Sequence, residues 1–434
     1  MRELIRQKIA DSLAAPVPAL TRRDVRLPAL PGKAVAVIGM RRTGKTCLLW
    51  QVIGDRLAGG AGREGLLYFS FEDERLAEMK ATDLHLVVEE YYRMHPGWRD
   101  RKRAAFLLDE IQVVPGWETF VRRLLDTERI EVFLSGSSAR LLSREVATSM
   151  RGRAMEALVH PFSFREYLRH LGREPATRCS RLDKAARSIL ERDLRDYLAK
   201  GGFPETLGIR HRDRNDLLRG YVDTALMRDV VERHQVSHPA ALRWLVRHLL
   251  ASPAGLFSIN KFYGDLRSQG FAVSKGTLHE YLGHLEDAFL IRTVSLASPS
   301  ERRRMVNPRK AYPIDPGLIP LYDTAGQPNP GHALETAVML ELERRGAQVS
   351  YICTGSGYEV DFLARHPEGR QEMIQACADL DHPATLEREA RALQEAGGEH
   401  RGAARILVGL NPEPPKAMPK GIRWYPASQW LLEG

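Results

Sequence analysis

The sequence predicts an α/β fold in which a parallel sheet carries helices on both of its faces. Two observations support this prediction. Short apolar runs suited to buried strands alternate with helical patterns between residues 31 and 170, and the first of these runs leads into a glycine-containing loop that a helix follows at once. Because the chain has 434 residues, we expect further domains after this sheet.

The glycine-containing loop, residues 39–46, reads Gly-Met-Arg-Arg-Thr-Gly-Lys-Thr and matches the phosphate-binding pattern GxxxxGK[ST]. An apolar strand is predicted directly before it, at residues 34–38, and a helix directly after it, at residues 47–53. Gly39 and Gly44 allow tight backbone conformations, so that N–H groups of the loop and the helix can point at phosphates. A chance match in a turn is the alternative, and the flanking elements make it the weaker one.

These features predict a P-loop NTPase sheet with ATP and Mg²⁺ as its cofactors. Lys45 is expected to reach the β- and γ-phosphates, and Thr46 to place its hydroxyl on Mg²⁺. The residues expected to contact the nucleotide are Gly39, Arg41, Arg42, Thr43, Gly44, Lys45, Thr46 and Cys47.

Another apolar strand, residues 104–108, ends in Asp109 and Glu110. Phosphoryl transfer needs a group that holds the metal and a base that orients the attacking water. We assign the metal to Asp109, through water, and the attacking water to Glu110. The alternative is that both carboxylates cap the next helix. Their position downstream of a phosphate loop favours ATP hydrolysis.

A further strand, residues 132–134, is followed by small polar residues that would face the γ-phosphate. Among them Ser137 is our candidate for sensing that phosphate or positioning the water, although a helix N-cap is an equally ordinary role for a serine.

Two arginines, Arg151 and Arg153, are candidates for an arginine that neutralises charge in the transition state. Each is expected to act either in its own site or in that of a neighbouring subunit. The chain is rich in arginine, so an ordinary surface position is the alternative for both.

The net charge of +9, from 64 basic and 55 acidic residues, favours polyanionic partners such as DNA. No apolar run approaches the ~20 residues of a membrane-spanning helix, and the first residues lack the apolar stretch of a signal peptide. The four cysteines have no metal-type spacing. We therefore expect a cytoplasmic protein without membrane contact.

Residues 171–235 read as a helical lid, and residues 236–325 show three helical patterns before two strand-like runs, the order of a winged helix. In such a domain the third helix enters the major groove and the wing touches phosphates. A module that contacts protein is the alternative. The predicted DNA-binding residues are Lys275, Thr277, His279 and His284 on the third helix and Arg302, Arg303 and Arg304 on the wing.

Glu335 and Asp361, in the last hundred or so residues, resemble two metal-holding carboxylates of a nuclease. Such sites also need a third carboxylate and a lysine on the next strand. That position reads Gln375-Ala376-Cys377, which supplies neither. We therefore expect a nuclease-like fold without cleavage activity.

The motifs Gly-Met-Arg-Arg-Thr-Gly-Lys-Thr, Leu-Leu-Asp-Glu-Ile-Gln, Gly-Gly-Phe-Pro-Glu and Glu-Val-Asp-Phe occur in this order. Together they resemble a large family of bacterial and archaeal AAA-type ATPases. The resemblance implies that Lys45, Thr46, Asp109 and Glu110 form the ATP site. It implies these parts: an N-terminal helical segment at 1–30, an ATPase core at 31–170, a helical lid at 171–235, a winged helix at 236–325, and a restriction-endonuclease-like α/β domain at 326–434.

The main hypothesis is a Mg²⁺-dependent ATPase that changes conformation on DNA, including branched or structured DNA. We expect a homo-oligomer, and a ring is one such assembly. The alternative is an ATPase switch of the signalling or defence type, whose winged helix and end domain bind protein partners. An active nuclease is the third hypothesis.

Overall fold

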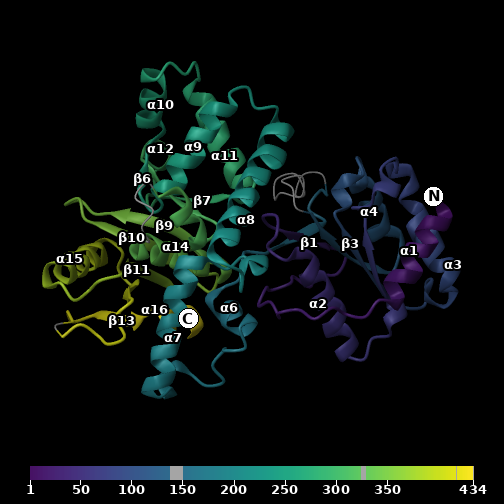
Figure 1. Cartoon of the computed structure of the whole chain (residues 1–434), viewed down its shortest axis with the longest axis horizontal. Helices are drawn as coiled ribbons and strands as arrows, with labels where there is room; N and C mark the ends of the chain where they lie inside the picture. The colour runs from purple at the N-terminus through teal and green to yellow at the C-terminus, as the bar shows by residue number, and fades with distance from the viewer. Residues whose placement is uncertain (137–149, 324–328, 417, 434) are drawn as a thin grey trace. The chain divides into compact units, whose positions relative to one another are not determined.

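The computed structural model describes residues 1–136, 150–323, 329–416 and 418–433. The chain forms two compact units, Met1–His160 and Pro161–Gly434, each with its own sheet and core (Figure 1).

The first unit is built on a five-stranded parallel sheet with the strand order β2-β3-β4-β1-β5. All residues of the first strand are buried, as expected for a strand with helices on both faces. The strands are β1 (Ala34–Ile38), β2 (Leu66–Ser70), β3 (Ala104–Asp109), β4 (Ile130–Ser135) and β5 (Ala154–Leu158). The predicted parallel α/β sheet is confirmed.

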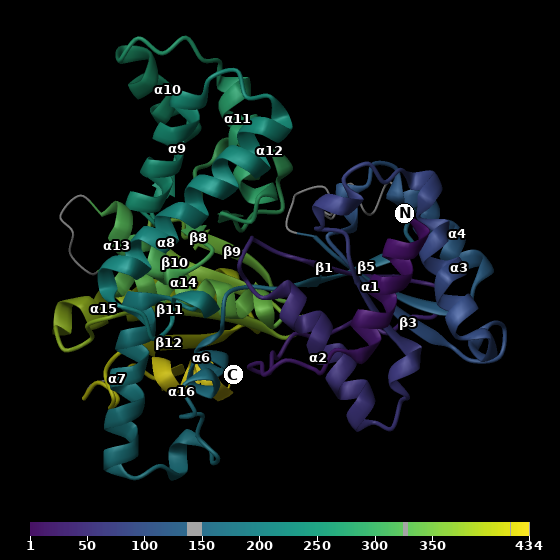
Figure 2. The same ribbon diagram turned by 45° about the vertical axis from the view of Figure 1, so that its right-hand side comes forward.

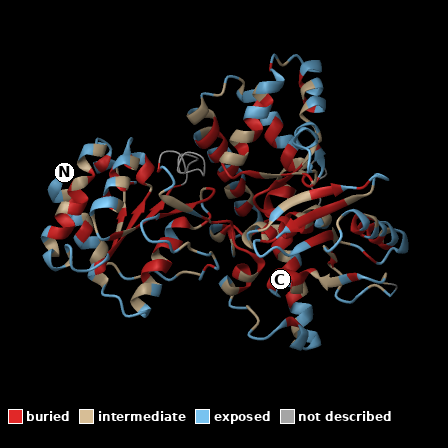
Figure 3. Ribbon diagram, turned by 180° about the vertical axis from the view of Figure 1, so that it is seen from behind, coloured by how far each residue is buried: buried red, intermediate tan, exposed pale blue. Residues whose placement is uncertain are grey.

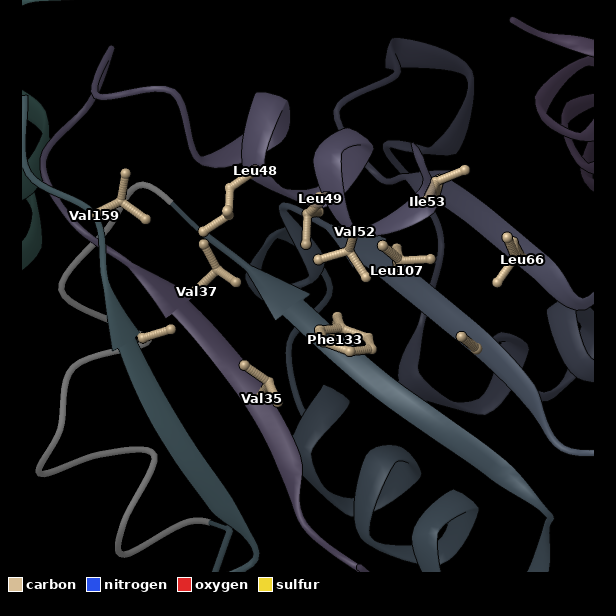
Figure 4. Packing of buried hydrophobic residues seen from close by; sticks show 12 residues of the cluster. Val35, Val37, Leu48, Leu49, Val52, Ile53, Leu66, Leu107, Phe133 and Val159 are labelled. Atoms are coloured by element: carbon tan, nitrogen blue, oxygen red, sulfur yellow. The ribbon is translucent and has the colours of Figure 1, made fainter. Parts of the chain in front are cut away.

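The core of this unit lies between the sheet and α2 (Lys45–Ala58), where apolar side chains of both point toward one another (Figure 4). On α2 the buried apolar residues recur with helical spacing, which gives the helix one apolar face. The labelled members of this cluster are Val35, Val37, Leu48, Leu49, Val52, Ile53, Leu66, Leu107, Phe133 and Val159.

Further helices in the described part of the first unit are α1 (Arg2–Ala14), α3 (His85–Met94) and α4 (Trp117–Thr127). The first of them packs against α3 and β2. Figure 2 labels α1 and α3. Buried Glu90 on α3 accepts hydrogen bonds from Arg2 and Arg6 of α1. The N-terminal helix therefore belongs to this unit.

The second unit begins with α6 (Phe164–His170), α7 (Lys184–Lys200) and α8 (His211–Thr224). The last helix continues into a π-helical segment, Ala225–Glu232, before α9 (Pro239–Ala251). π-helical turns are rare and often lie at functional sites.

The expected helix–helix–helix–hairpin order follows, with one change in the hairpin. The helices are α9, α10 (Ile259–Ser268) and α11 (Lys275–Asp287), and β7 (Ile291–Leu296) pairs antiparallel with β8 (Arg309–Pro313). The segment between these strands contains a short helix, α12 (Glu301–Val306), which the sequence analysis missed. Arg302, Arg303 and Arg304 therefore lie on a helix rather than on a hairpin tip.

The strands of the second unit form one mixed sheet in the order β13-β12-β11-β10-β9-β7-β8-β6. A parallel contact of Ser295 and Leu296 in β7 with β9 joins the hairpin to the later strands. Figure 3 shows buried residues along these strands. The remaining elements are β6 (Leu256–Phe257), α13 (Ile319–Tyr322), α14 (Pro330–Arg344), β9 (Gln348–Cys353), β10 (Glu359–Arg365), β11 (Gln371–Cys377), α15 (Pro383–Glu399), β12 (Ala404–Gly409), β13 (Ile422–Pro426) and α16 (Ala427–Glu433).

This shared sheet bears on the predicted domain limits. The segments expected as a winged helix and a nuclease-like domain share one sheet within the unit Pro161–Gly434, and the limit at residue 325 stays a prediction. β9 pairs with one edge of β7. Without this pairing, the backbone N–H and C=O groups along that edge would have no partners.

Candidate nucleotide site

The candidate site lies at the edge of the first sheet where β1, β3 and β4 end. These strands are parallel and adjacent in the order β3-β4-β1, so their carboxyl ends meet at one edge. Ligands of open α/β sheets bind outside this edge. The loop after β1, Asp109 at the end of β3 and Ser135 at the end of β4 are thereby brought together.

The backbone of the loop requires its glycines. Gly39 has a φ of 147° and Gly44 a φ of 93°, values that L side chains rarely adopt. A Cβ atom at Gly39 would also lie 2.3 Å from the carbonyl oxygen of Val159. Arg42 adopts a positive φ of 67° as well. Left-handed residues of this kind allow successive backbone N–H groups to point toward one bound phosphate.

The side chains of the loop already point inward. The Nζ atom of Lys45, which is buried, donates to the carbonyls of Gly39 at 3.1 Å and Met40 at 2.8 Å. The hydroxyl of Thr43 donates to the same Met40 carbonyl at 2.9 Å. The ammonium group is therefore held over the loop, where phosphate oxygens can replace its two carbonyl partners.

The carboxylate of Asp109 is the centre of a hydrogen-bond cluster. Its Oδ2 atom accepts from the hydroxyls of Thr46 at 3.0 Å and Tyr68 at 2.7 Å, and its Oδ1 atom accepts from Ser135. The two predicted metal ligands, Thr46 and Asp109, thus lie side by side. Oxygen donors of this kind are the ligands that Mg²⁺ prefers.

Tyr68 is a member of the site that sequence reasoning missed. Burial, together with the charge of Asp109, raises the pKa of its phenol well above the ordinary value. The phenol therefore stays a donor to Asp109. A tyrosine within an apolar strand carries no signal of this role, which depends on the pairing of β2 with β3.

Glu110 lies at a sharp turn after β3, with a left-handed φ of 55°. Its N–H group donates to Ser135 Oγ at 3.4 Å, and the side-chain amide of Gln112 donates to its carboxylate. Asp109 is the last residue of β3, whereas Glu110 has already left the strand conformation. The two adjacent carboxylates can therefore serve different roles.

Arg23 is a second residue whose role the sequence did not indicate, and it stabilises the loop by a hydrogen bond to the loop backbone. It is 4% exposed and donates from its guanidinium to the carbonyls of Thr43 and His160, each at 2.6 Å. Its backbone N–H donates to Gln51 Oε1 at 2.7 Å, and the amide of Gln51 donates back to its carbonyl at 3.0 Å. Arg23 thus connects three parts: its side chain joins the loop to the segment after β5, and its backbone joins both to Gln51 of α2.

Three further residues that we expected to contact the nucleotide lie nearer the surface of the protein. Arg41 is half-buried, and Arg42 and Cys47 are exposed. Ser137 lies outside the described residues, so its predicted role stays a prediction.

The structure does not bring Arg151 and Arg153 to the loop of their own subunit. Arg153 directly precedes β5, whose first residue pairs with Ala34 at the start of β1. The parallel strands therefore separate both arginines from the loop by their full length, about 16 Å for five residues. Arg153 also forms an ion pair with Asp126. The expectation that they act in their own site is wrong, and only the role in a neighbouring subunit remains a prediction.

The second unit brings Glu335 and Asp361 together, as expected, but around a lysine. Lys310 of β8 is 2% exposed, and its Nζ atom lies 2.9 Å from Glu335, 2.7 Å from Glu359 and 2.8 Å from Asp361. Burial disfavours its charge, yet the carboxylates outweigh burial and raise the pKa of Lys310 above its ordinary value.

The strand that follows Asp361 supplies neither a third carboxylate nor a lysine at Gln375-Ala376-Cys377, as read from the sequence, but other strands bring both groups to this cluster. Glu359 comes from β10 and Lys310 from the hairpin. Within the described ranges, no group of three or more His, Cys, Asp or Glu residues is arranged to hold a metal ion.

The predicted DNA-binding face of α11 is only partly available. Thr277 is engaged with Ser274, which caps the helix. His284 stacks on His234 with ring centroids 3.6 Å apart. Burial lowers the pKa of both rings, that of His234 to about 4, so they offer no charge to a phosphate at neutral pH. Lys275 and His279 are exposed, as are Arg302, Arg303 and Arg304 on α12.

None of the helices in the described part of the chain is long and apolar enough to cross a membrane.

Comparisons with known proteins agree with the geometry of the first unit. Residues 31–168 match the model of an AAA domain, and residues 191–325 match a domain of unknown function, DUF8612. The chain is 33% identical over 378 residues to the uncharacterized protein MJ1544 of Methanocaldococcus jannaschii. This alignment covers 86% of this chain and 81% of the relative. It is 28% identical over 330 residues to an uncharacterized protein of Haemophilus influenzae, covering 76% and 78%.

Among solved structures, the Walker-type ATPase PABY2304 of Pyrococcus abyssi aligns with a TM-score of 0.41 and 16% identity, covering 74% of this chain and 95% of that one.

The hydrogen bonds of Arg23 predict a loss of both stability and nucleotide affinity in Arg23→Ala. Two buried carbonyls would lose their donors, at a cost of about 1–3 kcal/mol. Thermal unfolding and calorimetric titration with ATP and Mg²⁺ measure the two effects. Arg26→Ala, which removes an exposed arginine nearby, is the matched control. Equal melting temperature and equal affinity in both variants would contradict the assigned role.

The lysine cluster predicts that Lys310→Met strongly destabilises the second unit. The substitution leaves three carboxylates without their shared cation, and breaking a buried ion pair costs about 3–5 kcal/mol. Urea unfolding measures the change, with Arg309→Met as the control at the adjacent, more exposed position. A Lys310→Met midpoint equal to that of the control would show that the cluster adds nothing to stability.

Proposed function

The chain belongs to the family of the uncharacterized protein MJ1544 of Methanocaldococcus jannaschii, and its residues 31–168 match an AAA domain. From this premise we propose that it is a Mg²⁺-dependent ATPase. The observation that carries the proposal is the 3.0 Å hydrogen bond between Thr46 and Asp109. It joins the end of the phosphate loop to the acidic strand end, which are the two halves of a metal–triphosphate site.

The residues present fit ATP and Mg²⁺. Thr46 and Asp109 offer the hard oxygen atoms that hold the metal, with Asp109 acting through water as expected from the sequence. When bound, Mg²⁺ neutralises charge on the triphosphate. Lys45 exchanges the carbonyls of Gly39 and Met40 for phosphate oxygens, and the backbone N–H groups of the loop complete the cradle.

Glu110 is the base that orients and polarises the attacking water. The amide of Gln112 donates to its carboxylate, and Glu110 itself has a left-handed backbone conformation directly after Asp109. A base placed by a fixed hydrogen bond needs no rearrangement at the moment of reaction. Ser137 stays our candidate for sensing the γ-phosphate.

We extend the proposal to action on DNA, with ATP turnover linked to a change of conformation. The net charge of +9 and the exposed cations on α11 and α12 support this extension. A homo-oligomer, in which Arg151 or Arg153 serves the site of a neighbouring subunit, completes the proposal. The position of both arginines away from their own loop favours that arrangement.

A second candidate function is an ATPase switch that binds protein partners. One observation favours it: α12 exposes two large apolar side chains, Met305 at 68% and Val306 at 67%. Contiguous exposed apolar surface is typical of sites that contact other proteins, and these two neighbouring side chains would contribute to such a surface. ATP-dependent assembly, with an ATPase rate that no DNA changes, would favour this function over DNA action.

The assigned base predicts that Glu110→Gln lowers kcat about 10²–10⁴-fold while KM for ATP changes little, because the amide cannot accept a proton. Lys45→Ala is expected to lose ATP binding as well. A coupled assay of ATP turnover measures both, and Glu74→Gln, at an exposed glutamate, is the control. Wild-type turnover in Glu110→Gln would sink the assignment.

Action on DNA predicts binding that weakens steeply as salt rises, because cations released from phosphates drive the association. The measurement is fluorescence anisotropy with duplex, single-stranded and junction DNA over a salt series. If none of these binds even at low salt, the DNA part of the proposal fails and the ATPase part stands.

A further inference from the structure

The second unit contains a wide groove that the predicted sites do not use. Its volume is about 1170 Å³, and α8, the π-helical segment, α9, α10 and α13 line it. Figure 2 labels α8, α9, α10 and α13 in the same part of the second unit. Pockets for small molecules usually measure about 300–1,000 Å³. The groove is therefore large enough for a segment of a chain-like ligand.

One large aromatic side chain stands open at this groove. Trp244 of α9 is 45% exposed and lines it, although tryptophan is usually largely buried. Arg243, Arg247 and His248 are exposed on the same face of the helix and line the groove as well. A flat aromatic ring among guanidinium groups is the combination that binds unpaired bases and their phosphates.

The arginines that line the groove make few and weak contacts with other side chains of the protein. Arg219 approaches Asp216 only to 3.9 Å, with both side chains more than half exposed. Arg243 contacts the sulfur of Met227 at 3.8 Å. Arg247 makes no hydrogen bond or ion pair with the part of the chain that the structure describes. Exposed pairs of this kind contribute little to stability, so these groups can turn to an anionic ligand.

A second aromatic residue lies beside the same cations. Burial raises the pKa of Tyr322 to about 12, and the nearby charges of Arg219 and Arg247 oppose that rise. The two arginines, from α8 and α9, therefore converge on one part of the groove. Two carboxylates, Asp223 and Asp265, also line it, which leaves three arginines against two acids.

We propose that this groove binds single-stranded nucleic acid, with a base stacked on Trp244 and phosphates held by Arg219, Arg243 and Arg247. The inference rests on the proposed action on DNA and names the form of DNA that would be held. A base must be unpaired to offer its face to the ring, so a duplex does not fit this mode. On α11, by contrast, Thr277 is hydrogen-bonded to Ser274 and His284 stacks on His234, so two of the four predicted contacts of that helix are already used within the protein.

The test is fluorescence anisotropy of the full chain with a labelled single strand, as DNA and as RNA, longer than the ~4–16 nucleotides of a typical single-strand site. Trp244→Ala is expected to weaken binding about tenfold or more, and Trp244→Phe to retain most of it because the ring remains. Arg247→Glu should weaken binding and reduce its salt dependence.

Arg210→Glu, which makes the same change of charge outside the groove, is the control. Lys275→Glu makes that change on the predicted recognition helix and tests the competing site there. Normal binding in Arg210→Glu, with weaker binding in Arg247→Glu than in Lys275→Glu, supports the groove. Melting temperature and ATP turnover, measured for every variant, show that a loss of binding is not a loss of folding.

Three results would overturn the inference. If Trp244→Ala and Arg247→Glu bind as the wild type does, the groove is wrong while action on DNA survives. If Lys275→Glu alone loses binding, the strand lies on α11 instead. If no single strand binds at low salt, the inference fails, and ATP turnover in the same sample decides separately whether the ATPase proposal stands.

Discussion

The parallel alignment of β1, β3 and β4 is the constraint on which the whole candidate site depends. Each strand is short and buried, and each ends in a residue or loop that can carry charge or a hydroxyl. Because the strands run the same way, those ends meet at one edge of the sheet. Thr46, Asp109 and Ser135, far apart in the sequence, become hydrogen-bonded neighbours. Without that alignment the phosphate loop would be an isolated turn.

The same constraint separates what could be predicted from what could not. The strands, Lys45, Thr46 and Asp109 could be read from the sequence, because a local pattern defines the loop and apolar runs define the strands. Tyr68 and Arg23 could not, since their roles depend on which strand lies beside which. For Arg153 the sequence left both its own site and a neighbouring subunit's site open, because sequence position does not say at which end of the sheet a strand begins.

The second unit shows a similar division. Its helices and paired strands follow the periodic patterns, whereas α12 is short and has no buried residue to give it a pattern. Glu335 and Asp361 were recognised as a pair, but the lysine between them comes from a strand of the preceding hairpin. A cation at that position neutralises the carboxylates and ties β8 to α14 and β10. The hairpin and the later strands share both a sheet and an ion cluster, which explains why they form one unit.

The account centres on Lys45 and Asp109 acting on one bound ATP. The most direct measurement is a crystal structure of Glu110→Gln with ATP and Mg²⁺, in which slow turnover preserves the nucleotide. We predict that Lys45 leaves the carbonyls of Gly39 and Met40 for the phosphates, and that Mg²⁺ lies at Thr46 with Asp109 linked to it through water. Nucleotide bound elsewhere, or Lys45 still on its carbonyl partners, would contradict the account.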